Sequence, residues 1–236
     1  MSDATDQPLR AFGKTTVPLS SSQRWSALGR VLISGYVDSY AVLHFGVFAS
    51  FMTGNTTLGG LHAGQSDLAA AAHSLLPIPC FLLGILGGTL LVQADRNHAS
   101  RRLSLLVATG LTAGVAGAYF AWPGWMSITV LSMSMGVLNT SVTRVGGQAV
   151  SLGFMTGDLN NLAQHLALGI RRAPVDQAQD SQDTHWRRAG LLGSLWVTFL
   201  VGAVLGAALV SRVAVWTLLM PALMLVGLAT LEPAAE

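Results

Sequence analysis

Charged residues are scarce in this sequence. Only 10% of its 236 residues are Asp, Glu, Lys or Arg, whereas 51% are hydrophobic, and an ordinary soluble domain has roughly a quarter of its residues charged. So few charges could not cover the surface of a soluble protein of this size. Several apolar stretches reach the length of about 20 residues with which a helix crosses a bilayer. The sequence therefore predicts an all-α membrane protein.

Several other features are absent. The single cysteine, Cys80, lies in an apolar run, which argues against disulfides and thiolate metal sites. No phosphate-binding loop and no inserted soluble domain are visible, which argues against ATP-driven transport by this chain alone. Residues 1–23 are polar and lack the apolar core of a signal peptide, so they are predicted to form a disordered cytoplasmic tail.

The basic residues are explained by membrane topology. A pI of about 9.1 could suggest nucleic-acid binding, but Lys and Arg near the ends of spans normally stay in the cytoplasm. The bilayer is therefore the expected partner, and neither a nucleic acid nor a cofactor is expected. Six transmembrane helices are predicted, at residues 24–48, 68–94, 103–121, 125–147, 189–211 and 213–231.

The six-span arrangement with both termini in the cytoplasm places nearly all basic residues on that side. An alternative with eight spans would leave eight basic residues inside and four outside. In the six-span arrangement only Arg212 faces out, Arg144 lies near the inner end of a span, and eleven others face the cytoplasm: Arg10, Lys14, Arg24, Arg30, Arg96, Arg101, Arg102, Arg171, Arg172, Arg187 and Arg188.

The two halves of the chain repeat each other. FMTGNTTLGGLH at residues 51–62 returns as FMTGDLNNLAQH at 154–165, GYVDS at 35–39 returns as GVLNT at 136–140, and FLLGIL at 81–86 returns as FLVGAV at 199–204. The order is the same in both halves. Because each half holds three spans, an odd number, the second half is predicted to be inverted relative to the first, as in many secondary transporters.

The repeat also defines the domain organisation. Residues 24–121 are predicted to form the first three-helix repeat, and residues 122–231 the second, with a polar cytoplasmic loop at 171–188. A helix from Thr53 to Gly64 would be only about 18 Å long, roughly half a bilayer. Each motif is therefore predicted to form a re-entrant half-helix or a break in the preceding span, buried in protein or lining a cavity.

Two acids and two amides occupy matching positions in the repeats. Asp38, midway along the first span, pairs with Asn139, and Asn55 pairs with Asp158. A carboxylate inside a span costs about 2.5 to 3.5 kcal/mol, and burial favours its protonated form, which allows proton exchange. The acids could therefore bind protons or substrate. Alternatively, a protonated aspartate could simply hydrogen-bond across helices.

The motif centres are the other candidate binding elements. Thr53-Gly54-Asn55 and Thr156-Gly157-Asp158 are typical of helix starts, with threonine as N-cap and glycine in a sharp turn. A free helix N-terminus would attract an anionic or strongly polar ligand through its N–H groups. The alternative is that both motifs are tight turns that only let helices pack.

Three residues are possible accessories to this site. His62 and His165 lie seven residues beyond Asn55 and Asp158, so each shares a helix face with its motif. No tight pair of ligands at i and i+4 accompanies them, even with Asp38 and His44 nearby, so no metal is expected. Arg144 either extends to the inner surface or pairs with Asp158.

The motifs resemble a known family. With GYVDSYAVLHFGVFASFMTGNT in the first half, and GVLNTSVTRVGG followed by FMTG in the second, residues 25–231 resemble the YoaK family of bacterial inner-membrane proteins, which is defined by a domain of unknown function. The resemblance implies a six-span protein of the bacterial inner membrane. The family-like residues are Asp38, Met52 to Asn55, Asn139, Arg144, Thr156 and Gly157; Asp158, His62 and His165 are not among them.

These features together predict a transporter of a small polar or anionic molecule, either proton-coupled or facilitative. A non-transporting assembly or regulatory protein is the first alternative. An intramembrane enzyme is the second, but it needs a nucleophile or metal beside a base, and the Asp and His residues have no recognisable catalytic spacing. The sequence therefore predicts that the chain is not an enzyme.

Overall fold

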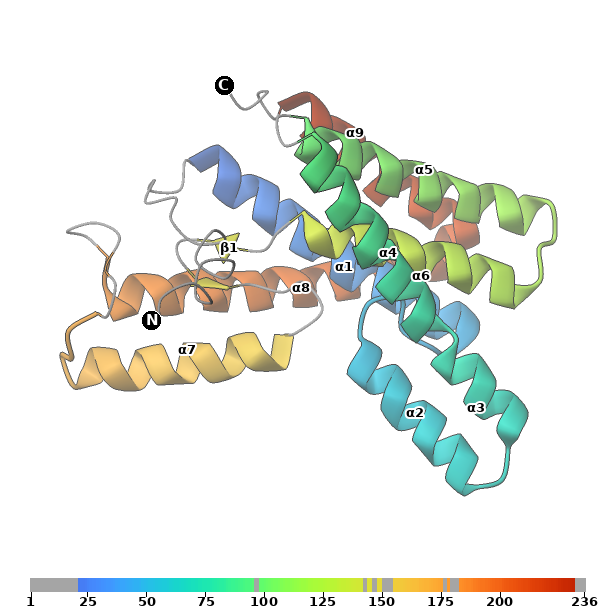
Figure 1. Ribbon diagram of the computed structural model, residues 1–236, viewed down its shortest axis with the longest axis horizontal. Coiled ribbons are helices and arrows are strands. Elements are labelled where there is room, and N and C mark those ends of the chain that lie inside the picture. The colour runs from blue at the N-terminus through green and yellow to red at the C-terminus, as the bar shows by residue number, and fades with distance from the viewer. Residues whose placement is uncertain are drawn as a thin grey trace, which may run out of the picture.

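The computed structural model describes residues 21–95, 98–141, 144–145, 148–149, 155–175, 178 and 183–231. Nearly all regular structure in these residues is helical, and a hairpin of two-residue strands joins α6 to α7 (Figure 1). The elements are α1 (Ser21–Phe45), α2 (Met52–Gly64), α3 (Leu68–Leu75), α4 (Pro77–Ala94), α5 (Ala99–Tyr119), α6 (Gly124–Thr140), β1 (Arg144–Val145), β2 (Gln148–Ala149), α7 (Met155–Ile170), α8 (His185–Val213), the 3₁₀ helix η2 (Ala214–Leu218) and α9 (Leu219–Leu231).

Three helical stretches among the described residues are long and apolar enough to cross a membrane. They are Leu68–Ala94, which comprises α3 and α4, then Ala99–Tyr119, and His185–Thr230, which comprises α8, η2 and most of α9. The last stretch is not one straight helix, because Ala214 has a φ of 48° and ends α8. The membrane class predicted from composition is therefore confirmed, whereas α1 and the 17-residue α6 are not in this set.

Three predicted boundaries are wrong. The predicted tail 1–23 extends too far, because α1 begins at Ser21, while residues 1–20 lie outside the described residues. The loop 171–188 also extends too far, since α8 begins at His185. The span 125–147 ends early, at Thr140. There Thr140 and Ser141 donate side-chain hydrogen bonds to carbonyl oxygens three residues back, which competes with continued helix.

The helices pack in matched pairs. α1 contacts α8, α4 contacts α6, and α5 contacts both α6 and α9, while α2 packs on α3 and α7 packs on α8. In Figure 1 the pairs α2–α3 and α7–α8 extend away from the central helices in different directions. The buried core lies between α1, α5, α6 and α9, and its largest fully buried side chains there include Ile33, Leu103, Leu111, Ile128 and Leu131.

Glycines bring α1 and α8 into backbone contact. A Cβ atom on Gly35 would collide with the carbonyl oxygen of Phe199, and one on Gly202 would collide with that of Leu32. One turn further along both helices, a Cβ on Gly206 would lie 2.5 Å from the carbonyl oxygen of Tyr36. The two helices therefore run parallel, and small residues allow the close approach.

Glycines also bring α4 and α6 into backbone contact. A Cβ on Gly136 would collide with the carbonyl oxygen of Phe81, and one on Gly84 would collide with that of Met133. Gly88 faces the side chain of Thr140 one turn further on. These helices also run parallel. In sequence, Gly136 is the repeat partner of Gly35, and Gly84 is the partner of Gly202.

Candidate functional site

The chain turns back after α1 and returns towards the middle of that helix. Gly46 follows α1 with a φ of 70°, a conformation that glycine adopts without steric cost. Ser50 then donates from its backbone N and its Oγ to the two carboxylate oxygens of Asp38, both at 2.7 Å, and its Oγ lies 3.1 Å from that of Ser34. Asp38 lies seven residues before the end of α1, so the segment that follows α1 runs back along this helix by about 10 Å.

Asn55 fixes the same returning segment. Its Oδ1 accepts a hydrogen bond from the backbone N of Phe48 at 2.8 Å, and its Nδ2 donates to the backbone O of Phe48 at 2.7 Å. The side chain is completely buried. Asp38 and Asn55 therefore clamp the segment between α1 and α2, and α2 begins two residues beyond Ser50, which contacts both Ser34 and Asp38 of α1.

The predicted roles of Thr53 and Gly54 at the helix start are wrong. α2 begins at Met52, with Phe51 at the N-cap position and no side-chain cap, so Thr53 is already inside the helix and is exposed. A Cβ atom on Gly54 would collide with the ring of Phe51. Gly54 is required for aromatic packing on the first turn of α2, and the sharp turn is made by Gly46.

The second motif has a similar place but different chemistry. α7 begins at Met155, and Thr156 in its first turn is exposed while Gly157 is half-buried. Asp158 is 3% exposed, and its Oδ2 has no hydrogen-bond partner within the part of the chain that the structure describes. A buried polar atom without a partner is costly, so this carboxyl group differs sharply from the amide of Asn55.

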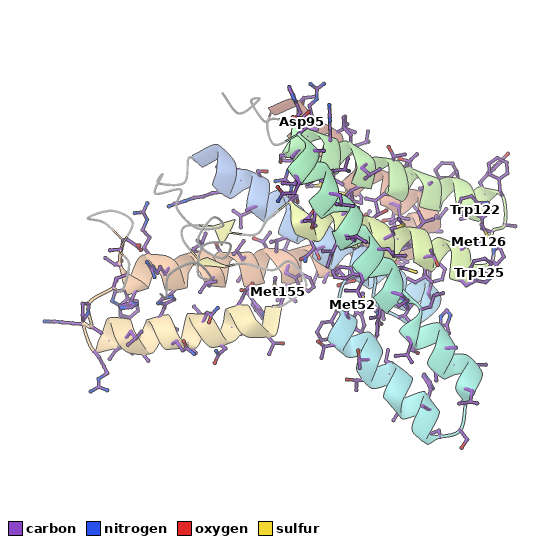
Figure 2. The ribbon with its side chains drawn as sticks, viewed as in Figure 1. Met52, Asp95, Trp122, Trp125, Met126 and Met155 are labelled. Carbon is purple, nitrogen blue, oxygen red and sulfur yellow. The ribbon has the colours of Figure 1, made fainter. Side chains whose placement is uncertain are left out.

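A cavity of about 480 Å³ lies where the two motifs meet. Its walls come from α1, the segment between α1 and α2, the first turns of α7, and α8. Met52 and Met155, the first residues of α2 and α7, mark the inner ends of the motif helices in Figure 2. The volume is typical of small-molecule sites.

The structure brings together only some of the predicted site residues. Asp38 and Thr156 both line the cavity. The other candidates are not among its lining residues: Thr53, Gly54, Asn55, Asn139, Gly157 and Asp158. Asn139 lies at the end of α6 and is half-buried. The backbone of Arg144 forms part of β1, and its side chain lies outside the described residues.

The histidines fall into two different settings. His62 lies in the last turn of α2. His165 lies towards the outer end of α7, and its Nδ1 is 2.9 Å from Nδ1 of His185, whose Nε2 is 3.3 Å from the carbonyl oxygen of Pro174. Burial first, and then the positive charge of Arg188, hold the pKa of His165 below its usual value. No group of three or more metal-binding side chains occurs among the described residues.

Sequence reasoning missed three contributors to these sites. Ser50, Trp196 and His185 gave no repeat signal, because their roles depend on contacts between segments that are distant in sequence. Ser50 holds Asp38, Trp196 lines the cavity, and His185 pairs with His165. Of these three residues, only His185 had a signal in the sequence: it follows Thr184, a typical N-cap residue, whose Oγ1 accepts a hydrogen bond from the backbone N of Arg187 at the start of α8.

Long apolar helices with polar groups buried between them define a helical membrane protein. The chain belongs to the family described as "Protein of unknown function (DUF1275)", which matches residues 27–231. The predicted relationship to YoaK-type membrane proteins is thereby confirmed.

Two relatives support this assignment. The UPF0700 transmembrane protein YoaK of Bacillus subtilis (strain 168) is 29% identical over 143 residues, which are 58% of this chain and 64% of that protein. The chain thus spans slightly less than two thirds of this relative. The UPF0700 transmembrane protein RA0705 of Rhizobium meliloti (strain 1021) is 27% identical over 222 residues, 88% of both chains. No solved structure matches the chain.

Proposed function

We propose that this chain is a secondary transporter that moves a small molecule across the bacterial inner membrane by a proton-coupled or facilitative mechanism. The cavity between the two motifs carries the proposal. It lies along the C-terminal half of α1, from Gly35 to Leu43, and both halves of the chain contribute walls to it. A site at the junction of two repeats, beside interrupted helices, is the arrangement that secondary transporters use. We do not assign an enzymatic activity.

The inverted repeat is part of this proposal. The crossing of α1 with α8 and that of α4 with α6 use repeat-equivalent glycines against repeat-equivalent carbonyl oxygens. Each crossing therefore joins one helix of the first half to one helix of the second. A pseudo-two-fold relation between the halves accounts for both crossings. In the six-span arrangement α1 and α8 cross the membrane in the same direction, which agrees with their parallel packing.

The proposed orientation, with both termini in the cytoplasm, is supported by Arg30. Its guanidinium is buried, and Nη2 donates to Ser100 Oγ at 2.8 Å and to Ser104 Oγ at 3.1 Å. These bonds hold the basic N-terminal part of α1 beside the start of α5, where Arg101 and Arg102 lie. Clustering of basic residues at one end is typical of the cytoplasmic face.

The chemistry of the cavity favours one of the two expected ligand classes. The sequence predicts a small polar or anionic ligand. Among the described lining residues the only ionisable side chain is Asp38, an acid, and hydroxyl groups come from Ser39 and Thr156. A ligand with hydrogen-bond donors therefore suits these walls better than an anion, since an anion would face a carboxylate without a basic partner.

Asp38 supplies the test of proton coupling. In the Asp38→Asn variant, the amide oxygen can still accept from the backbone N of Ser50, so the returning segment keeps a hydrogen bond, but the group can no longer bind and release a proton. We expect the variant to fold and to lose proton-linked uptake. The measurement is uptake into proteoliposomes from a panel of labelled amines, polyols and carboxylates, with and without a pH gradient.

The matched control for this experiment is Asp67→Asn. Asp67 caps α3 through its Oδ1 and is exposed, and asparagine is an equally good N-cap. Uptake by this variant should equal that of the wild type. Unchanged proton-linked uptake by Asp38→Asn would rule out the coupling role of Asp38, and no uptake of any solute by the wild type would contradict the proposed transport.

A membrane assembly or regulatory protein is the second candidate, and one observation favours it. Asp38 and Asn55 both hydrogen-bond to the segment between α1 and α2, as expected if the polar motifs only lock helices together. In that case Asp38→Asn and Asn55→Ala should lower the thermal stability of the purified protein, and no solute should raise the stability of the wild type.

A further inference from the structure

Four aromatic side chains line the cavity. Phe48 and Phe51 come from the segment before α2, and Trp196 and Phe199 come from α8. The first two rings are packed edge to face, with centroids 5.2 Å apart. The remaining wall is largely aliphatic. Ring faces carry negative electrostatic potential and attract cations, so four rings around one cavity are a specific chemical feature.

The carboxylate of Asp38 has capacity left for a ligand. Each of its oxygens accepts one hydrogen bond from Ser50 and the backbone of Ala49 donates a third, whereas an ionised carboxylate offers about four lone-pair sites. Asp38 lines the cavity, and among the described residues that line it there is no Lys, Arg or His. In the described part of the chain the cavity is therefore lined by one acidic group and four aromatic rings, with no basic side chain beside them.

The start of α2 does not offset this preference. A bare helix N-terminus would favour an anion, but the ring of Phe51 lies against Gly54 in the first turn of α2 and also lines the cavity. Aromatic surface therefore faces the cavity at this position. On α7, Thr156 and Leu159 line the cavity, and the acidic residue Asp158 lies between them in sequence and is buried, so α7 also brings no basic side chain to this end in the described chain.

We propose that the cavity binds a lipophilic organic cation, a small molecule with an aromatic or apolar body and one positively charged centre. The charge lies near Asp38, and the body packs against the rings of Phe51, Trp196 and Phe199. This inference rests on the proposed transport function and names its ligand class. It goes beyond the polar or anionic ligand that the sequence predicts.

The test uses two ions of the same shape and opposite charge, tetraphenylphosphonium and tetraphenylborate. Binding of each to the full-length protein in detergent micelles is measured by equilibrium dialysis, with empty micelles subtracted. We expect the wild type to bind the phosphonium at least tenfold more tightly than the borate. Asp38→Asn should weaken phosphonium binding at least tenfold, and Trp196→Leu should weaken it several-fold, while Asp67→Asn should bind it as the wild type does.

A second measurement separates a binding defect from a folding defect. Phosphonium should raise the midpoint of thermal unfolding of the wild type and not that of Asp38→Asn, even where both unfold at similar temperatures without ligand. Tighter binding of borate, or equal phosphonium binding by the wild type and Asp38→Asn, would overturn the ligand class. Binding with the expected pattern, combined with no uptake of any solute, would keep the ligand class and reject transport.

Discussion

The two motif segments share a sequence pattern and differ in how they satisfy their polar groups. In the first, Asn55 is completely buried and both atoms of its amide bond to Phe48. In the second, Asp158 at the equivalent position is almost as buried, yet its Oδ2 has no partner in the described chain. The same motif position therefore serves as a rigid clamp in one half, and in the other it holds an acid with one oxygen that has no partner within the described residues.

This difference shows that two segments of similar sequence can hold different chemistry. The helix crossings need glycine in both halves, because backbone touches backbone there. The motif position tolerates an amide in one half and an acid in the other. Substitutions at equivalent positions of the two halves therefore test which residues are required for helix packing and which have a role in one half alone.

The largest effect is expected at the glycine crossings. Gly35→Ala and Gly136→Ala each place a Cβ against a backbone carbonyl oxygen of the facing helix, which cannot rotate aside, so the cost should be about 3 kcal/mol or more, at the upper end for overpacking. We expect similar losses of stability at both positions, because the contacts are equivalent. The measurement is the thermal unfolding midpoint of each purified variant in detergent.

Glycines in open positions are the matched controls for these two variants. A Cβ on Gly87 in α4 or Gly227 in α9 would meet no atom within 4 Å, so Gly87→Ala and Gly227→Ala should not lose stability. A loss at only one of Gly35 and Gly136 would show that the two crossings are not equivalent and would argue against the inverted repeat.

An intermediate effect is expected from exchanging the amide and the acid between motifs. Asn55→Asp removes the Nδ2 donor and leaves the carbonyl oxygen of Phe48 facing a carboxyl group, so we expect a loss of about 1–3 kcal/mol. Asp158→Asn removes the cost of burying an acid and should leave stability unchanged or higher. Both are measured by thermal unfolding, and equal losses in both variants would show that Asp158 is held as firmly as Asn55.

The smallest effect is expected from the histidine pair at the outer end of α7. The pKa of His165 is lowered from its usual value of 6.5, so the folded state favours the neutral ring. This contribution to stability is fully present above pH 6.5 and is lost as the pH falls through the lower folded value. Wild-type stability should therefore fall with acidification more steeply than that of His165→Gln.

His62→Gln is the control for this pH experiment. His62 occupies the repeat-equivalent position, and no histidine partner of its ring is found in the described chain. The measurement is the unfolding midpoint between pH 5 and 8, and His62→Gln should retain the wild-type slope. Identical slopes for His165→Gln and the wild type would exclude His165 as the source.

The membrane class and the family could be predicted from the sequence, whereas the details of the motifs could not. Threonine and glycine beside a helix start suggested a cap and a turn, but Phe51 occupies the N-cap position and Gly46 makes the turn. A cap depends on where the first helical turn closes. Here this point was set by Asn55 and Asp38, which hold Phe48 and Ser50.

The sequence by itself determined that the chain lies in a membrane and is built from two related halves, because scarcity of charge and repetition are properties of residue order alone. Tertiary structure decided which polar groups meet. Asp38 and Thr156 share a cavity, whereas Asn55 bonds to its own loop. The physical reason is that a buried polar group takes the nearest partner that the packed helices offer, and this partner is set by helix crossings and chain reversals that span both halves.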